Sequence, residues 1–509
     1  MNPAKSTLTV SLWTLISRLT GFLRDSVMAN FIGASMMSDV IVAATKLPNS
    51  FRRLLGEGAL TSIFVPMFSK TLSTSKPNAL KFTNTTFTYL AITVSLLTIV
   101  ATIFMESIIK ITSPGFLSDP NKFHLTVELA RINFGYLATI SLCSICGAVL
   151  NSIGKFIYFA ALPVMFNLGL CMTFLISKNP EKIGHVYSYT CLAIGFLQLI
   201  FLLVVCRRQG FPIKLSVEKT PGEYSFGVLL KKMGNGLIGS GIYQVNIFVD
   251  SFFASMTAGG VAYLYYSDRI SQLPITLVGS AMVISLLPVL SRYIKDKEYK
   301  KVQEIHDNAV IFSLFAIIPC FVSILTIGNE IVSVVYERGS FYASDTLAVA
   351  KLLKIFSIGF FFLVIAKIYN AIFFANLDTK KPMLISLFCM IINFAINTAT
   401  HKEYGYICVA YASTISAIFG GFLSLYFAIK SKLITISRPL MRKSILIILA
   451  NIILFCFQFQ TSRMLKIYFQ SPALILMIIS FTSISIYLFL IKIMRVYSMS
   501  EIKSVLKKS

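Results

Sequence analysis

The sequence predicts an all-α polytopic membrane protein of about 14 transmembrane helices, with two pseudo-symmetric six-helix lobes plus two C-terminal helices. The first observation behind this fold class is composition. The 509-residue chain is 56% hydrophobic and 13% charged, with a mean hydropathy of +0.77, whereas soluble domains carry about 25% charged residues. The second is that apolar runs of about 20 residues, long enough to cross about 30 Å of hydrocarbon, recur along nearly the whole chain. The third is an internal repeat among these runs.

Polar breaks divide the chain into about fourteen apolar spans. In chain order we expect them at residues 8–33, 38–70, 82–110, 124–151, 157–177, 185–206, 226–256, 261–291, 305–334, 345–375, 382–399, 405–430, 441–460 and 472–494. An even total places both termini on one side of the membrane. The tails and loops of that side carry roughly 28 lysines and arginines against about 10 opposite, so both termini are predicted to be cytoplasmic.

The repeat is visible in small and polar residues that return at a nearly constant offset along the chain. Ala59, Pro66, Ser69 and Lys70 recur as Ala281, Pro288, Ser291 and Arg292, and Asn151 and Asn167 correspond to Asn376 and Asn393. We therefore expect an N-lobe over residues 1–222, a C-lobe over 223–432, and an appended helix pair with a cytoplasmic tail over 433–509. Six spans per copy give the copies the same orientation, with a substrate path between the lobes.

The stretch from residue 17 to residue 70 is apolar, yet it is rich in cations. These are Arg18, Arg24, Lys46, Arg52 and Arg53. A cation at the bilayer centre costs about 2.5–3.5 kcal/mol, so several persist only where they face protein or water. The second lobe contributes Asp268 and Arg269 at a nearby place in the repeat. We expect these charges to line a cavity.

Arginine predicts the substrate class. It stays charged in any surroundings, and its planar guanidinium matches phosphate oxygens two at a time. We assign substrate binding to Arg18, Arg24, Arg52 and Arg269, and cavity or gating roles to Asp25, Asp39, Lys46, Arg53, Glu57 and Asp268. Any single cation among them has an alternative role at a membrane surface or in a structural ion pair. The set as a whole contains more cations than acids, which favours an anionic phosphate or diphosphate head group.

A second polar set has the ligands of a small hard cation. Asp250 stands alone in an apolar run, Asn393 and Asn397 lie one helical turn apart, and Ser413 follows the Val409 carbonyl by one turn. Oxygen ligands of this kind suit Na⁺, and the alternative is a hydrogen-bonded cluster between helices. No catalytic residues and no other cofactor are predicted. The basic residues lie in short segments between spans rather than in one patch, which argues against nucleic acid as a partner.

Several motifs, in order, resemble the MurJ/MviN lipid II flippase family of the multidrug/oligosaccharidyl-lipid/polysaccharide exporter superfamily. They are SRLTGFLRD, ASMMSDVIVAATKLPNSFRRLLGEGALTSIFVP, YYSDRISQLPITLVGSAM, VVYERGSF and FFANLDTKKP. The resemblance implies that fold, with two extra helices forming a groove for the lipid tail. It also implies that Arg18, Arg24, Arg52 and Arg269 are cavity arginines that contact the diphosphate and sugar head group.

The expected function is that of a transporter in the bacterial cytoplasmic (inner) membrane. By the resemblance, it moves lipid II from the cytoplasmic to the periplasmic leaflet by alternating access, and the membrane potential or a cation gradient, Na⁺ or H⁺, resets it. Expected partners are lipid II, membrane lipids and the cell-wall synthesis machinery. The alternatives are a flippase for another polyprenyl-linked oligosaccharide and an ion-coupled drug exporter, whose cavity would be acidic and aromatic. A membrane enzyme would need a metal-binding carboxylate pair or a catalytic histidine at a membrane face, and the sequence offers neither.

Overall fold

The computed structural model describes residues 3–53, 59–177, 179–218 and 225–496, which are almost entirely helical. The chain forms two compact units. The first comprises Met1–Ala262 and Gly339–Phe341, and the second comprises Tyr263–Arg338 and Tyr342–Ser509. Each unit has its own packed interior. The predicted division into two six-helix lobes and an appended pair, with boundaries near residues 222 and 432, remains a prediction; residue 222 itself lies outside the described residues.

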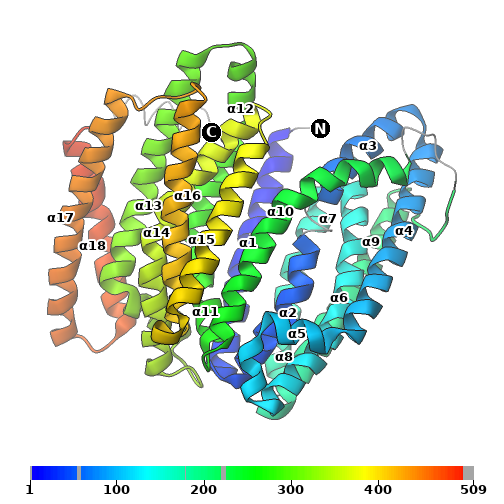
Figure 1. Cartoon of the computed structure of the whole chain (residues 1–509), viewed down its shortest axis with the longest axis horizontal. Helices are drawn as coiled ribbons and strands as arrows, with labels where there is room; N and C mark the ends of the chain where they lie inside the picture. Colours follow the sequence, from blue (N-terminus) through cyan, green and yellow to red (C-terminus); the bar gives the residue numbers. More distant parts are fainter. Residues whose placement is uncertain (1–2, 54–58, 178, 219–224, 497–509) are drawn as a thin grey trace. The chain divides into compact units, whose positions relative to one another are not determined.

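The described part of the first unit is a bundle of long and short helices, coloured blue to green in Figure 1. Its elements are α1 (Pro3–Ile32), α2 (Met36–Arg52), α3 (Ala59–Thr74), α4 (Lys76–Ile103), α5 (Met105–Thr112), the 3₁₀ turn η2 (Pro114–Ser118), α6 (Pro120–Ser152), α7 (Phe156–Ala160), α8 (Leu162–Ile176), α9 (Pro180–Arg208) and α10 (Phe226–Ser255). Several of them begin at a polar cap followed by proline, as at Asp119 before α6, which favours the first helical turn.

Helix α6 is the centre of the first unit. Helices α2, α3, α4 and α9 all pack on it, and α1 packs on α8. Its small residues permit this crowding: a Cβ on Gly147 would lie 2.1 Å from the ring of Phe159. Phe64 of α3 stacks on Phe82 of α4, with ring centroids 5.2 Å apart. This packing holds the polar side chains of α1 and α2 in fixed places.

An extended segment after α9 is bound to the side of α4. The Ser216 backbone N–H donates to Thr88 Oγ1 at 2.8 Å, and Thr88 Oγ1 lies 3.1 Å from the Ser216 carbonyl. Thr85 has the same double contact with the backbone of Glu218, at 3.1 Å each way. Asn84 accepts from the backbone of Lys214 at 3.0 Å. We call residues 211–218 the strap, and its partners on α4 occupy one face of that helix.

The second unit follows on from α11 (Gly260–Pro274), whose first turn belongs to the first unit. Its other elements are the π-helical turn η4 (Ile275–Ser280), α12 (Ala281–Lys295), α13 (Tyr299–Tyr336), α14 (Ala343–Ala375), α15 (Lys380–Tyr404), α16 (Ile407–Lys430), α17 (Arg438–Tyr468) and α18 (Pro472–Ile493). Helix α14 packs on α12, α13 and α16, and α15 packs on α16.

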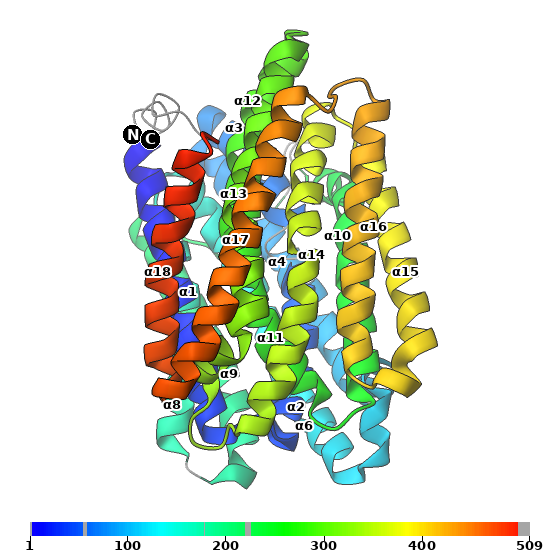
Figure 2. The same ribbon diagram turned by 90° about the vertical axis from the view of Figure 1, so that its left-hand side faces the viewer.

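Helices α17 and α18 lie side by side along α13 in Figures 1 and 2. Buried polar contacts hold them there. Gln458 of α17 donates to Ser323 of α13 at 3.1 Å and to Ser483 of α18 at 2.9 Å, and it accepts from Thr326 of α13 at 2.7 Å. Helix α13 departs from helical geometry at Ile327. Hydrogen bonds between membrane helices are worth about 0.6–2 kcal/mol each, so this hub fixes the register of the pair.

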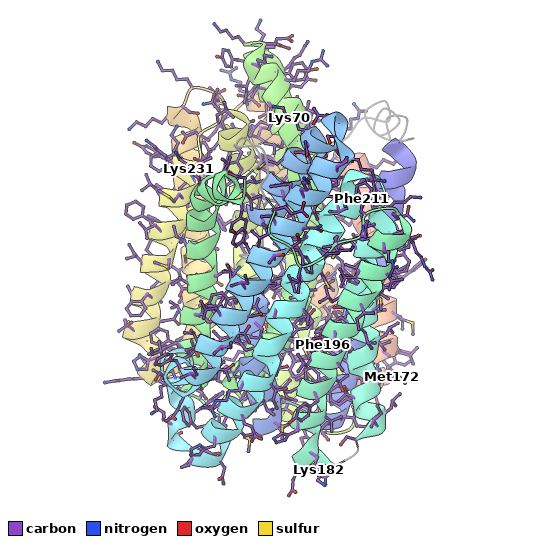
Figure 3. All side chains as sticks on the ribbon, turned by 90° about the vertical axis from the view of Figure 1, so that its right-hand side faces the viewer. Lys70, Met172, Lys182, Phe196, Phe211 and Lys231 are labelled. Atoms are coloured by element: carbon purple, nitrogen blue, oxygen red, sulfur yellow. The ribbon has the colours of Figure 1, made fainter. Side chains whose placement is uncertain are left out.

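Ten helices in the described residues are long and apolar enough to cross a membrane. The expected second span contains two shorter helices, α2 and α3, and the expected eighth contains α11, η4 and α12, which is why these do not count as single long spans. The total of about fourteen remains a prediction. Figure 3 shows Met172 and Phe196 on the outer face, both about half exposed, with Lys182 at one end of the unit and Lys70 and Lys231 towards the other. An apolar belt between basic ends is typical of a lipid-facing surface.

Candidate functional site

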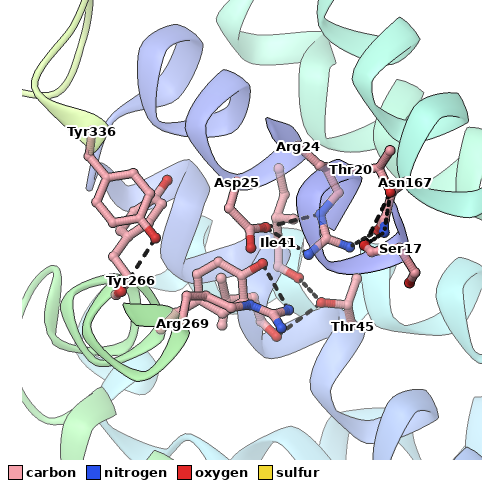
Figure 4. A network of polar contacts seen from close by, with 12 residues as sticks. Ser17, Thr20, Arg24, Asp25, Ile41, Thr45, Asn167, Tyr266, Arg269 and Tyr336 are labelled. Atoms are coloured by element: carbon pink, nitrogen blue, oxygen red, sulfur yellow. Dashed lines mark hydrogen bonds and ion pairs between the residues drawn. The ribbon is translucent and has the colours of Figure 1, made fainter. Parts of the chain in front are cut away.

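The most enclosed arginine of the predicted set is Arg24, on α1. It is 8% exposed, and its guanidinium is held on two sides (Figure 4). Nε and Nη2 donate to Asp25 Oδ1 at 3.0 and 2.7 Å, and Nη1 donates to Asn167 Oδ1 of α8 at 3.1 Å. A buried cation needs both a counter-charge and hydrogen-bond acceptors. Asp25 and Asn167 supply them.

Asn167 also fixes the backbone from which Arg24 extends. Its Nδ2 donates to the Ser17 carbonyl at 3.1 Å and lies 3.4 Å from Thr20 Oγ1. A Cβ on Gly21 would lie 3.3 Å from the same amide nitrogen. Glycine at this position therefore lets α8 approach α1 closely enough for the amide to bridge backbone and guanidinium. In the sequence Asn167 is marked only as a repeat position, and this role was not predicted.

Asp39 lies at the start of α2 and is fully buried. Oδ2 pairs with Lys122 Nζ of α6 at 2.6 Å and accepts the Gly259 backbone N–H at 3.0 Å. Oδ1 accepts the Ala262 backbone N–H at 2.7 Å. Since Gly259 and Ala262 flank the first turn of α11, the carboxylate caps that helix and meets the positive end of its dipole. The Lys122 ammonium also lies 4.1 Å from the centre of the Phe116 ring.

Lys46, in the middle of α2, contacts α10. Its Nζ donates to Ser251 Oγ at 2.7 Å. Asp250, the acid predicted to bind a cation, is the neighbour of Ser251 on α10 and is half-buried in the first unit. Neither Lys122 nor Ser251 was among the residues predicted from sequence. Their partners lie far away in the chain, and no local pattern marks such pairs.

The remaining predicted cations of the first unit differ in their surroundings. Arg18 on α1 is half-buried and makes no hydrogen bond or ion pair with the described residues. Arg52 is half-buried at the end of α2, and Arg53 is exposed just beyond it. Glu57 lies outside the described residues. Arg24 and Arg18 are thus the two extremes on α1, one tightly braced and one with no partner in the described part of the chain.

In the second unit, Arg269 of α11 lies over an aromatic ring. Its guanidinium carbon is 4.8 Å from the Tyr265 ring centre, and Nη2 donates to Tyr265 Oη at 3.2 Å (Figure 4). The aromatic face and hydroxyl orient the cation without neutralising it. Asp268 is exposed and accepts a hydrogen bond from Gln272 at 2.5 Å. Tyr265 was not predicted, although it lies one helical turn before Arg269.

Three residues of the predicted cation set lie together in the second unit. Asn397 Nδ2 donates to Asn393 Oδ1 at 2.9 Å, and Asn393 Nδ2 donates to Ser413 Oγ at 3.1 Å. Asn397 Oδ1 is enclosed and accepts no hydrogen bond from the described residues. Val409 is buried one turn before Ser413 on α16. An enclosed amide oxygen with nothing to satisfy it suits a cation ligand. No group of three or more His, Cys, Asp or Glu in the described part of the chain is placed to hold a metal.

Comparison with known proteins places these features in a family. The family model "Lipid II flippase MurJ" matches residues 28–505. A probable lipid II flippase MurJ of Rickettsia prowazekii (strain Madrid E) is 33% identical over 415 residues, which are 81% of each chain. One of Rhizobium tropici is 35% identical over 404 residues, 78% of this chain and 75% of the relative.

Solved structures agree on the fold. "Lipid II flippase MurJ, inward closed conformation" superposes with a TM-score of 0.80 at 24% identity and covers 96% of this chain and 99% of that one. An inward-facing multidrug resistance MATE family transporter of the MOP superfamily has a TM-score of 0.62 at 14% identity, covering 84% of this chain and 94% of that one. At these identities the likeness concerns the fold alone, and it agrees with the all-α fold class expected from the sequence.

Proposed function

The chain belongs to the lipid II flippase MurJ family, and we propose that it transports lipid II, an undecaprenyl-diphosphate-linked peptidoglycan precursor, from the cytoplasmic to the periplasmic leaflet. The mechanism we propose is alternating access, in which a cavity accepts the head group while the lipid tail stays in the bilayer. Such a path needs fixed positive charge inside the membrane, because the diphosphate is the most costly part of the substrate to carry across hydrocarbon.

Arg18 carries this proposal. No other charged residue lies between Lys5 and Arg24 on α1, and Arg18 has no counter-ion among the described residues. A structural cation inside a membrane protein is normally paired, as Arg24 is with Asp25. An arginine without such a pair is suited to an anion that arrives and leaves. We assign Arg18 the first contact with the diphosphate, with Arg52 as a further contact in the same unit, and we propose Arg269 as a substrate-binding residue of the second unit.

Arg24 has a different part in this proposal. Asp25 and Asn167 hold its guanidinium in one orientation, so that little side-chain freedom is lost when an anion approaches. The neighbouring carboxylate lowers the net charge, which favours release of the diphosphate on the far side. We therefore expect Arg24 to orient the head group and Arg18 to supply most of the attraction.

The asparagine cluster of the second unit is the basis for a proposed coupling ion. We propose that Asn393, Asn397, Ser413 and the Val409 carbonyl hold a small cation such as Na⁺ through oxygen atoms. The enclosed Oδ1 of Asn397 supports this assignment. When bound, the cation supplies positive charge that the inward-directed membrane potential draws through the protein. A proton or the membrane potential alone is the alternative driving force.

The surroundings of the protein complete the proposal. The lysine and arginine bias of the loops supports cytoplasmic termini in a bacterial inner membrane. The partners proposed are lipid II itself, the surrounding membrane lipids and the enzymes of cell-wall synthesis that make and use the precursor. Direct contact with those enzymes is not needed, because the membrane itself connects the two steps.

The test uses cells depleted of their own flippase and complemented with variants of this chain at native expression. Arg18→Ala is expected to abolish growth and to lower the lipid II accessible on the outer leaflet. The matched control is Arg208→Ala, which removes an exposed arginine at the end of α9 and is expected to grow normally. Membrane-fraction immunoblots show that both variants insert. Normal growth and normal outer-leaflet lipid II with Arg18→Ala would contradict the proposal.

A further inference from the structure

Basic side chains gather at one end of the second unit, where α13 ends, α14 begins and α17 ends. This is the side predicted to be poor in lysine and arginine, with about 10 in all its loops and helix ends. Four basic residues lie within this small region: Lys351, Lys354, Arg463 and Lys466. Because lysine and arginine are otherwise scarce on this side, their concentration here indicates a specific role.

The inner part of the cluster is built around a buried acid. Glu330 of α13 has 8% of its side chain exposed, and its Oε1 pairs with Lys466 Nζ of α17 at 2.6 Å. Glu330 Oε2 is enclosed and accepts no hydrogen bond from the described residues. Lys354 of α14 donates to the neutral Asn329 Oδ1 at 3.1 Å. A Cβ on Gly328 would lie 3.2 Å from the Lys354 side chain, so this glycine lets the lysine stem pass along α13.

The charges of this inner group do not cancel. Lys354 and Lys466 lie within electrostatic range of each other and of Glu330, and two cations with one carboxylate leave a net positive charge. Two other acids, Glu337 and Asp345, lie at the connection between α13 and α14. They are engaged there by Thr346 at 2.8 Å and by the Tyr342 backbone at 3.0 Å.

Helix geometry extends the positive charge along α14 and α17. Lys351 precedes Lys354 by three residues on α14, and Arg463 precedes Lys466 by three residues on α17, so each pair shares a helix face. Exposed apolar side chains lie inward of these basic residues on α17. Phe459, four residues before Arg463, is 42% exposed, and Phe455, one turn earlier, is 37% exposed. Basic groups near the end of a span with exposed apolar side chains towards its middle match a lipid molecule, whose phosphate lies at the surface and whose chains lie below.

We propose that Lys354 and Lys466 bind the phosphate group of a membrane lipid at this end of α13, α14 and α17. Lysine is a point-charge phosphate binder whose ammonium keeps further N–H groups after its first contact. Glu330 and Asn329 hold the two ammonium groups in place. The phosphate comes either from a glycerophospholipid such as phosphatidylglycerol or from a polyprenyl diphosphate. The site lies wholly in the second unit and does not depend on the proposed transport of lipid II.

Binding is measured on the full-length protein in neutral detergent by native mass spectrometry, with separate titrations of phosphatidylglycerol, a short polyprenyl diphosphate and inorganic phosphate. Each lysine near a lipid surface contributes about a fivefold gain in affinity. Lys354→Ala leaves the Glu330–Lys466 pair intact and is expected to weaken lipid binding about fivefold. Lys354→Ala with Lys466→Ala is expected to weaken it about 25-fold. The control is Lys402→Ala, an exposed lysine near the end of α15 on the same predicted side.

The outcomes distinguish the two possible sources of the phosphate, a glycerophospholipid and a polyprenyl diphosphate. A lysine-dependent loss with phosphatidylglycerol identifies a bulk-lipid site, and a loss confined to the polyprenyl diphosphate identifies a substrate or product site. Lys354→Arg is expected to retain binding because the charge is kept. Equal binding of both lipids by wild type and Lys354→Ala would overturn the proposal. Inorganic phosphate bound as tightly as either lipid would overturn the assignment to a lipid. The measurement reports lipid binding and does not require transport. A failure of the proposed lipid II transport would therefore leave its result unchanged.

Discussion

The ion pair between Asp39 and Lys122 permits a prediction that depends on charge burial. Asp39→Ala removes a fully buried carboxylate and leaves the Lys122 ammonium, 9% exposed, without its counter-ion. Breaking a buried pair from one side costs about 3–5 kcal/mol. The same change leaves the backbone N–H groups of Gly259 and Ala262 without their acceptor, at about 1–3 kcal/mol each. These costs are not additive, and we expect a destabilisation of at least about 4 kcal/mol.

Lys122→Met is expected to cost less. It leaves the carboxylate buried, but the two backbone N–H groups still donate to it. The pair Asp39→Asn with Lys122→Met is expected to cost less than the sum of its single variants, because the amide oxygen keeps one backbone bond and no unpaired charge remains. The assay is thermal unfolding of the purified protein in detergent. Unfolding is monitored by the labelling of cysteines that are buried in the folded protein.

The expected order of melting temperatures runs from wild type, through Lys122→Met, to Asp39→Ala, which is lowest. The control is Lys182→Ala, which removes an exposed lysine near the start of α9 and is expected to melt like wild type. If Asp39→Ala melts within a degree or so of the control, the carboxylate does not carry the stability assigned to it. If the double variant is as unstable as the sum of its parts, the pairing itself is wrong.

Three further predictions concern α1, the turn after it and the loop before α15. Asn167→Ala removes an acceptor from a buried guanidinium and is expected to cost about 2–4 kcal/mol, measured by thermal unfolding and complementation, whereas Asn151→Ala serves as a control with little effect. Gly33→Ala places a Cβ 2.1 Å from a backbone carbonyl oxygen at φ +60° and is expected to abolish complementation, while Gly227→Ala, with nothing nearer than 4.0 Å, is not; equal growth of the two would refute the steric argument. Burial disfavours the charged form of Asp378, but hydrogen bonds from the lysine three residues on prevail and hold its pKa below 3.8. Asp378→Asn keeps an oxygen for the Lys381 backbone N–H but removes the charge that pairs with the Lys381 ammonium at 2.9 Å, so it is expected to lower stability by up to about 1 kcal/mol at neutral pH. The difference from wild type is expected to be lost as the pH falls through that lowered pKa, and a difference that is as large in acid as at neutral pH would contradict this.

The sequence was informative about the helical elements and about some local polar contacts. Hydropathy separated most of the long helices, because a membrane imposes one length and one composition on each span, but the expected spans at residues 38–70 and 261–291 each contain more than one helix. The four-residue spacing of Asn393 and Asn397 predicted a shared face, and the structure joins them by a hydrogen bond. Asp25 was expected to balance cations, and it contacts Arg24. Local periodicity is sufficient for predictions of this kind.

Partners from distant parts of the chain were not predictable in the same way. Lys122 lies before an expected span and resembles any loop lysine, yet it is buried against Asp39. Asn167 resembles a small polar residue in an apolar run, yet it holds Arg24. Pairing across helices depends on crossing geometry and on close approach at glycines such as Gly21. A single sequence contains no direct record of that geometry, so the choice of partner becomes visible only in three dimensions.

The strap on α4 sets a length limit on movement. Its last anchored residue, Glu218, is bonded to Thr85, and the next fixed point is Ser225, whose side chain caps α10. A chain between these two residues, even fully extended, reaches no further than about 25 Å. Without the anchor, the free connection would begin near Gly210 and would be about twice as long. The threonines of α4 therefore act as the fixed end of a short tether, which limits how far the start of α10 can travel from α4 during any transport cycle.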